Sequence, residues 1–235
     1  MTDFQNQPIL QIYDIKNPLE IYSNISKGTL EPVVSSSLIR CENVYFENKI
    51  QGTNPDTFML SSVAILIEEI SYILKSEYNA GVHIFDAYRS RATQKGIFLD
   101  IKKGIRKANP RFDEKKIIEE TMKFAADPDK PSQYPIPPHT TGAVIDLTIF
   151  DISTGNLWDM GTSFDDVSEK ANTIYYENLV PQNKPDKIIK ANRRILFNLM
   201  KKHHFVNYVN EWWHYGICDC IWSKTVNHNQ FLPEL

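Results

Sequence analysis

The sequence predicts an α+β fold with a central antiparallel sheet and helices packed on its outer face. Helical and strand-like segments follow one another without a repeated βαβ pattern, and the last two strands are expected to form a hairpin. The 235 residues, 42% hydrophobic and 23% charged, suit a domain that buries its own core. We therefore expect a single domain over residues 1–235.

The first half of the chain is expected to supply most of the helices. Residues 1–37 mix polar and apolar side chains with three prolines and predict an irregular N-terminal arm with short strands. Residues 57–78 carry apolar side chains at helical spacing, with Asp56 as the expected N-cap. Residues 82–85 are typical of a short buried strand. Two further helices are expected, over residues 91–107 and 112–126.

The second half of the chain is expected to supply most of the sheet. A proline-rich loop leads to His139, and residues 143–150 predict a buried strand. Residues 185–202 predict a basic amphipathic helix. Residues 205–209 and 212–217 predict the two closing strands, paired antiparallel.

Charge and composition exclude several functional classes. The net charge is −3 and no basic block stands out, which argues against a nucleic-acid partner. No apolar stretch reaches the roughly 18 residues that a membrane span needs. The N-terminus lacks a positive segment followed by an apolar run, so we expect a cytoplasmic protein. Three cysteines, an odd count, are expected to be reduced and structural: Cys41, Cys218 and Cys220.

His139 and Asp146 form the first pair of candidate metal ligands. His139 ends the proline-rich loop, and Asp146 follows inside the apolar strand. An ionised carboxylate in a buried strand is unfavourable unless it is paired or bound to a cation. An ion pair with a nearby Lys or Arg is the alternative explanation for Asp146.

Glu211 and His214 lie in the aromatic segment EWWHY (211–215). Residues three apart in an ideal strand point to opposite faces, so both serve one site only if Glu211 lies at a bend or bulge. A hydrogen bond to a backbone carbonyl is the alternative role for His214. Two His and one Asp are a common zinc set with the fourth position left for water. Glu211 would then take the proton of that water and pass it on.

Arg89 stands at the end of the segment DAYR (86–89), directly after a buried strand. A cation fixed at such a position can stabilise a developing oxyanion. Arg91 begins the next helix and is expected at the surface. The other histidines are expected to be packed or solvated: His83, His203, His204 and His228.

Taken in order, the motifs DAYR (86–89), HTTGAVID (139–146) and EWWHY (211–215) resemble those of the D-alanyl-D-alanine dipeptidases. These enzymes are relatives of zinc D,D-carboxypeptidases. The resemblance extends from about residue 40 to residue 217. It implies a zinc peptidase with one Zn²⁺ per chain and a small D,D-dipeptide as substrate.

The resemblance also implies roles for individual residues. His139, Asp146 and His214 would be the zinc ligands, Glu211 the general base and acid, and Arg89 the transition-state stabiliser. Asp165, in the segment MGTSFD (160–165), would bind the free amino group of the substrate. Considered without the resemblance, Asp165 could equally be a helix N-cap.

The sequence departs from the family pattern next to the metal histidine. Pro137 and Pro138 stand where the family often has serines, one of which helps to hold the substrate amine. Thr141 stands where an arginine is often found. These changes leave the metal ligands and Glu211 intact, so they affect the identity of the dipeptide rather than the hydrolytic chemistry.

Three other functions remain open. A D,D-carboxypeptidase acting on longer peptidoglycan stems would use the same scaffold, although Asp165 and a closed pocket would disfavour it. An iron oxygenase also uses two His and one carboxylate, but its first His and acid are usually almost adjacent. A non-catalytic zinc module usually closes all four coordination positions with protein ligands.

Overall fold

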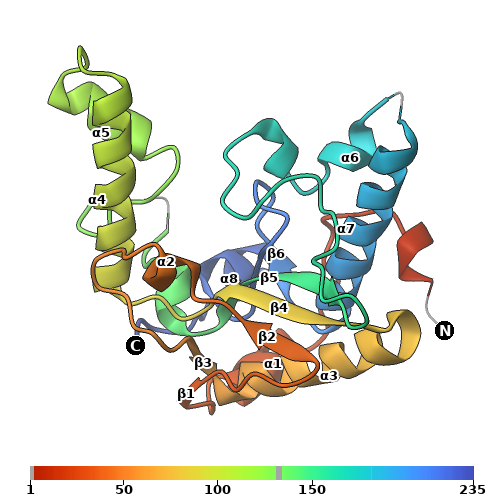
Figure 1. Ribbon diagram of the computed structural model, residues 1–235. Helices are drawn as coiled ribbons and strands as arrows, with labels where there is room; N and C mark the ends of the chain where they lie inside the picture. The colour runs from red at the N-terminus through yellow and green to blue at the C-terminus, as the bar shows by residue number, and fades with distance from the viewer. Residues whose placement is uncertain (1–2, 131–133, 181) are drawn as a thin grey trace.

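The computed structural model describes residues 3–130, 134–180 and 182–235. A five-stranded sheet in the order β2-β4-β5-β7-β6 forms its centre (Figure 1). The strands are β2 (Ile39–Cys41), β4 (Ala80–Asp86), β5 (Val144–Asp151), β6 (Val206–Asn207) and β7 (His214–Gly216). The predicted α+β class is confirmed. Only the β2–β4 pair is parallel among the described strands of this sheet, because a crossover through a long helix joins these two strands.

That long helix, α3 (Ser61–Tyr78), packs along the sheet beside β4 (Figure 1). Its buried side chains recur at helical spacing from Val63 to Leu74 and join the main core with the inner residues of β4 and β5. The predicted N-cap Asp56 is wrong, since Leu60 occupies that position. The residues just before the helix are used instead by strand β3 (Phe58–Leu60).

The N-terminal arm is more ordered than predicted. It contains η1 (Phe4–Asn6), helix α1 (Pro18–Ile25) and strand β1 (Leu30–Pro32), which pairs antiparallel with β3. Pro18 sits at the first turn of α1, where its missing N–H is not needed. Ser62 Oγ donates to the carbonyl of Ile25 at 2.7 Å, so contact with α3 fixes the end of α1.

Two helices project from one edge of the sheet as an arm (Figure 1). They are α4 (Arg91–Ala108) and α5 (Glu114–Thr121), which pack against each other. The side chains of Ser90 and Asp113 cap their N-termini. A short helix, α2 (Val44–Glu47), lies near the base of this arm.

The remaining helical elements complete the fold around the sheet. They are η2 (Pro138–Thr141), η3 (Glu169–Ala171), α6 (Tyr175–Asn178), α7 (Lys184–Lys202) and α8 (Cys220–Thr225). Helix α7 confirms the predicted basic amphipathic helix and begins with a capping box formed by Asn183 and Asp186. In the part of the chain that the structure describes, no helix combines the length and apolar character that crossing a membrane requires.

Candidate functional site

Strand register places Asp146 at the centre of the site. In the sheet, Asp146 on β5 is paired with Asp86 on β4 and with His214 on β7. Residues directly opposite one another on antiparallel strands project from the same face, so these side chains converge. A register shift between Ile84 and Asp86 brings Asp86 into line with the other two.

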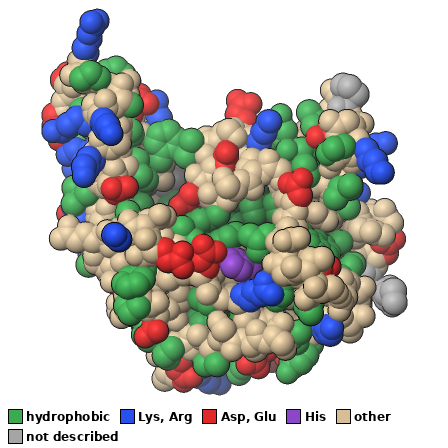
Figure 2. All heavy atoms as spheres, viewed as in Figure 1, with side chains coloured by type: hydrophobic (Ala, Val, Ile, Leu, Met, Phe, Trp, Pro, Cys, Tyr) green, Lys and Arg blue, Asp and Glu red, His purple; other side chains and the backbone are tan. Residues whose placement is uncertain are grey.

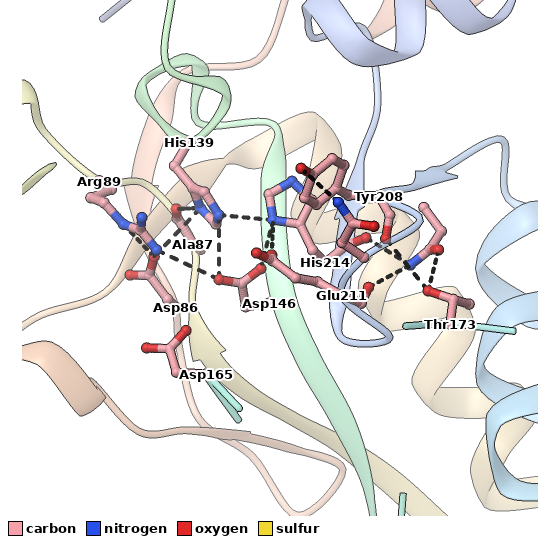
Figure 3. Close-up of polar contacts among 12 residues, drawn as sticks. Asp86, Ala87, Arg89, His139, Asp146, Asp165, Thr173, Tyr208, Glu211 and His214 are labelled. Atoms are coloured by element: carbon pink, nitrogen blue, oxygen red, sulfur yellow. Dashed lines mark hydrogen bonds and ion pairs between the residues drawn. The ribbon is translucent and has the colours of Figure 1, made fainter. Parts of the chain in front are cut away.

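His139 reaches the same point from η2. Its Nε2 lies 3.3 Å from Asp146 Oδ2 and 3.3 Å from His214 Nδ1 (Figure 3). Its Nδ1 lies 2.7 Å from the carbonyl oxygen of Ala87. The carbonyl makes Nδ1 the protonated nitrogen, so the lone pair of Nε2 is directed at the cluster.

The three side chains fit a metal ion. One ligand atom from each of His139, Asp146 and His214 lies within 4.8 Å of the others, and all three residues are buried. Asp146 Oδ1 is 3.0 Å from His214 Nδ1 but has no hydrogen-bond partner among the described residues. Electron-pair donors that converge on one point suit a shared cation. Two imidazoles and one carboxylate match the ligand set of a zinc site with an open fourth position.

Charge in the cluster keeps Asp146 ionised. Burial alone would raise the pKa of Asp146, but the neighbouring His139 and His214 hold that pKa well below its ordinary value. Burial likewise opposes protonation of His214, and the contact with Asp146 nevertheless raises the pKa of this imidazole. The aspartate is therefore available as an anionic ligand.

Glu211 lies beside the cluster because the chain bends before β7. A turn closes with the Glu211 N–H donating to the carbonyl of Tyr208 at 3.0 Å, and β7 begins only at His214. This is the bend that the sequence required for Glu211 and His214 to share one site. Glu211 Oε2 lies 3.4 Å from His214 Nδ1, with the Glu211 side chain 35% exposed. Burial raises the pKa of Glu211 above its ordinary value, which makes its carboxylate a better proton acceptor.

Arg89 is held rigidly at the other side of the cluster. Its Nε and Nη2 donate to Asp86 Oδ2 at 3.0 and 2.8 Å, and its Nη1 donates to Gln94 Oε1 at 3.0 Å. Nη2 also lies 3.6 Å from Asp146 Oδ2. These contacts fix a guanidinium next to the candidate metal ligands, where it can meet negative charge that develops on a bound molecule.

Asp165 faces the site from a loop after β5. Its backbone has φ of 59°, and its Oδ2 accepts a hydrogen bond of 2.9 Å from the Tyr45 hydroxyl. Asp165 as a residue is exposed, yet its carboxylate lies against buried Tyr45, and this local desolvation raises its pKa to about 6. The alternative role as a helix N-cap is wrong, since Ser168 occupies that position for η3.

Tyr45 is the site residue that sequence reasoning missed. Its hydroxyl links Asp165 to Arg89 Nη2, which lies 3.2 Å away, and its ring lies 4.7 Å from the Arg89 guanidinium carbon. It lies on α2, which has only four residues and is too short to show a periodic pattern. Only the order N-V-Y-F, with Asn43 capping the turn, marks a helix start there.

The cluster opens into a cleft of about 1510 Å³. One wall consists of α4 and of the segment that follows α5, from Met122 to Pro128, and the other of residues 165–180. The face in Figure 2 is hollowed between these two parts of the molecule. Both walls carry exposed apolar side chains, including Met122 and Phe124 on one side and Val180 on the other. The closed pocket expected from the sequence is therefore wrong.

Comparison with known proteins identifies the family. The family model described as D-ala-D-ala dipeptidase matches residues 58–231. The chain belongs to the D-Ala-D-Ala dipeptidase family. It is 30% identical over 162 residues to a D-alanyl-D-alanine dipeptidase of Synechocystis sp., and 35% identical over 83 residues to one of Enterococcus faecalis. These alignments cover 64% of this chain and 64% of the first relative, and 34% and 37% for the second. The chain thus spans less than two thirds of the length of these relatives.

The arginine, histidines and cysteines to which the sequence assigned no role in the site lie outside the cluster of His139, Asp146 and His214 in this dipeptidase-family chain. Arg91, with a side chain 45% exposed, pairs with Glu234 at the surface as expected. His83 contacts Glu42 at 3.0 Å, and His203 contacts the carbonyl of Leu199 at the end of α7. The cysteines are free thiols, as predicted: Cys41, Cys218 and Cys220.

Proposed function

We propose that this chain is a zinc-dependent dipeptidase that hydrolyses D-alanyl-D-alanine, or a similar D,D-dipeptide with a free amino terminus. The observation that carries the proposal is the convergence of His139, Asp146 and His214, with the Glu211 carboxylate 3.4 Å from one of them. Membership of the D-Ala-D-Ala dipeptidase family supports it. The facial triad of an iron oxygenase needs no carboxylate in the position of Glu211.

His139 Nε2, Asp146 and His214 Nδ1 would hold the zinc ion. A zinc ion bound there polarises the scissile carbonyl and acidifies a water molecule. Glu211 takes the proton from the attacking water at its carboxylate oxygen. The same carboxylate then delivers that proton to the leaving nitrogen, because no other acid lies in this turn before β7.

Arg89 and Asp165 would bind two groups of the first residue of the substrate, its carbonyl oxygen and its ammonium group. The Arg89 guanidinium, fixed by Asp86 and Gln94, faces the carbonyl oxygen as it gains negative charge. The Asp165 carboxylate, held by Tyr45, pairs with the ammonium group of the substrate. A carboxylate reserved for that ammonium limits substrates to peptides whose first peptide bond is the one cleaved.

A second function is favoured by the open cleft. Residues from Gln94 to Ile105 line it along α4, a distance of about 16 Å at the rise of an α-helix. An extended dipeptide spans only about 7 Å. The additional length would accommodate a peptidoglycan stem, as in a D,D-carboxypeptidase on the same scaffold.

A panel of three substrates tests both functions with the zinc-loaded protein. D-Ala-D-Ala, its N-acetyl derivative and an N-acetyl tripeptide ending in D-Ala-D-Ala are compared by release of D-alanine. We expect fast release from the free dipeptide alone. Equal or faster release from the tripeptide would establish the carboxypeptidase instead, and no release from any of the three would refute both.

Asp165→Ala sharpens this test. Loss of a charge pair costs on the order of 2–5 kcal/mol, so hydrolysis of the free dipeptide should weaken strongly while the acetylated dipeptide changes little. Asp166→Ala is the matched control. The adjacent Asp166 also lines the cleft, but its Oδ1 accepts a hydrogen bond from the Ser168 N–H. Equal effects of the two substitutions would remove Asp165 from its proposed role.

A further inference from the structure

Arg193, in the middle of α7, is a buried cation whose side-chain hydrogen bonds all end on main-chain carbonyls. The residue is only 2% exposed. Its Nε donates to the carbonyl of Met160 at 2.8 Å, its Nη1 to Asn172 at 2.8 Å and its Nη2 to Lys170 at 2.7 Å. Arginine is rarely buried without such partners, so these three bonds explain why it can lie inside the protein.

The three carbonyls belong to the two ends of one loop, residues 160–172. The guanidinium therefore joins the beginning of this loop to its end, and Asp165 lies between them. Inside the loop, the Phe164 ring stacks on Phe85 with centroids 4.7 Å apart. Because the guanidinium is planar and its N–H groups point in fixed directions, it sets the spacing of the loop ends.

The same loop base is bonded to the segment that carries Glu211. The Trp212 N–H donates to the carbonyl of Ala171 at 3.0 Å, and the Trp212 indole Nε1 donates to Thr162 Oγ1 at 2.8 Å. The Arg193 guanidinium carbon lies 5.7 Å from the centre of the Trp212 ring. The Arg193 side chain thus lies where the loop that carries Asp165 meets the turn that carries Glu211.

We propose that Arg193 is a positioning residue that fixes the separation between Asp165 and Glu211, and thereby restricts cleavage to the peptide bond next to a free amino terminus. This inference rests on the proposed function, because it takes Asp165 as the ammonium partner and Glu211 as the proton carrier. The first peptide bond lies one residue from the ammonium group. A small displacement of the loop therefore moves Asp165 away from the ammonium group of a substrate whose first peptide bond lies at Glu211, and this weakens substrate binding.

Lysine cannot replace Arg193 in this role. Burial lowers the pKa of Arg193 to about 10, so the group remains charged at neutral pH and keeps its N–H donors. The Tyr176 ring, 4.8 Å from the guanidinium carbon, adds a cation–π contact. A lysine ammonium keeps the charge but cannot present the same planar set of donors to carbonyls on both ends of the loop.

Arg193→Lys is compared with Arg194→Lys, a neighbouring substitution on the same helix. Arg194 forms its ion pair with Glu177 and, among the residues that the structure describes, has no hydrogen bond to the loop. For Arg193→Lys we expect retained zinc and a KM for D-Ala-D-Ala raised about tenfold, with kcat within about threefold. The preference for free over N-acetylated dipeptide should fall by a similar factor. Arg194→Lys should change neither quantity.

A second variant and a double mutant separate positioning from a general loss of structure. Thr162→Val removes the acceptor of the Trp212 indole and should act in the same direction with a smaller effect, even if Arg193→Lys does not fold. In an Asp165→Ala background, Arg193→Lys should no longer raise KM, because the group it positions is gone. Additive effects, or an unchanged preference for the free dipeptide in both Arg193→Lys and Thr162→Val, would overturn the inference. If the wild-type protein cleaves no dipeptide, the proposed function itself fails.

Discussion

Asp146 and Asp165 are both carboxylates of the same site, but the protein holds them in different ways. Asp146 lies on β5, 2% exposed, in register with residues on both neighbouring strands. Asp165 lies on a loop at positive φ, exposed to the cleft, with its carboxylate bonded to Tyr45. Neighbouring histidines hold the pKa of Asp146 low, whereas desolvation raises that of Asp165 to about 6.

This difference indicates a division of labour within the site. The half that we propose to bind the metal takes Asp146 and His214 from hydrogen-bonded strands and His139 from η2, and a change at one of them disturbs a buried cluster of charges. The half that we propose to bind the substrate depends on side-chain contacts between separate loops and helices. We therefore expect changes at the metal half to abolish the reaction, and changes at the substrate half to alter which molecules react.

The largest effect is expected at the proposed metal ligands. His139→Ala, Asp146→Ala and His214→Ala should each lose most of the bound zinc. Loss of several kcal/mol of charge stabilisation lowers kcat/KM on the order of 10³-fold or more. Zinc per chain, measured by elemental analysis, checks this, with Asp151→Asn at the end of β5 as the control. Full zinc retention in any two of the three variants would contradict the assignment.

The next largest effect is expected at Glu211, where a substitution tests proton transfer separately from metal binding. Glu211→Gln should keep its zinc and lower kcat by about 10²–10⁴-fold, because the amide cannot accept the proton of the attacking water. Glu169→Gln, another carboxylate lining the cleft, is the matched control. Activity within about threefold of wild type would assign the proton transfer to another group.

A pH experiment tests the substrate half directly. Because the pKa of Asp165 is about 6, its ionised form is lost below that pH, and kcat/KM for the free dipeptide should decline there. Asp165→Asn should abolish this dependence. The dependence should persist unchanged in the variant only if another group causes it.

The same pKa shift predicts an effect on stability. The folded-state pKa of Asp165, about 6, lies above the unfolded value of roughly 3.9, so folding favours the protonated form. That stabilisation is complete below about pH 4 and is lost as pH rises through 6. Asp165→Asn should therefore raise the Tm at pH 7.5 relative to wild type, and this gain should vanish near pH 4. An equal gain at both pH values would exclude the ionisation of Asp165 as its cause.

The smallest effect is expected next to His139. Pro137 lines the cleft and offers no side-chain hydrogen bond. Pro137→Ser introduces a hydroxyl, worth roughly 0.5–1.5 kcal/mol as a net hydrogen bond, and should lower KM several-fold with kcat unchanged. Pro135→Ser, also on the cleft wall, is the control. An unchanged KM would show that the substrate amine does not approach this loop.

The sequence by itself determined the parts of the site that depend on local pattern. An acid inside the apolar strand 144–151 predicted a charge compensated by other groups, and the structure places two histidines within 3.3 Å of it. The requirement that Glu211 lie at a bend followed from strand geometry alone. The helices α3 and α7 were predictable because each repeats buried side chains at helical spacing over more than three turns.

Only the tertiary structure decided the rest. Helix α1 forms because Ile25 and its carbonyl meet α3, and β3 forms because β1 pairs with it, so neither depends on its own residues alone. Tyr45 bonds both to Asp165, 120 residues away in the sequence, and to Arg89, 44 residues away. Arg193 ties the ends of the loop 160–172 through carbonyls that any residue would supply. Local pattern cannot record such contacts, because they depend on where distant backbone atoms lie after folding.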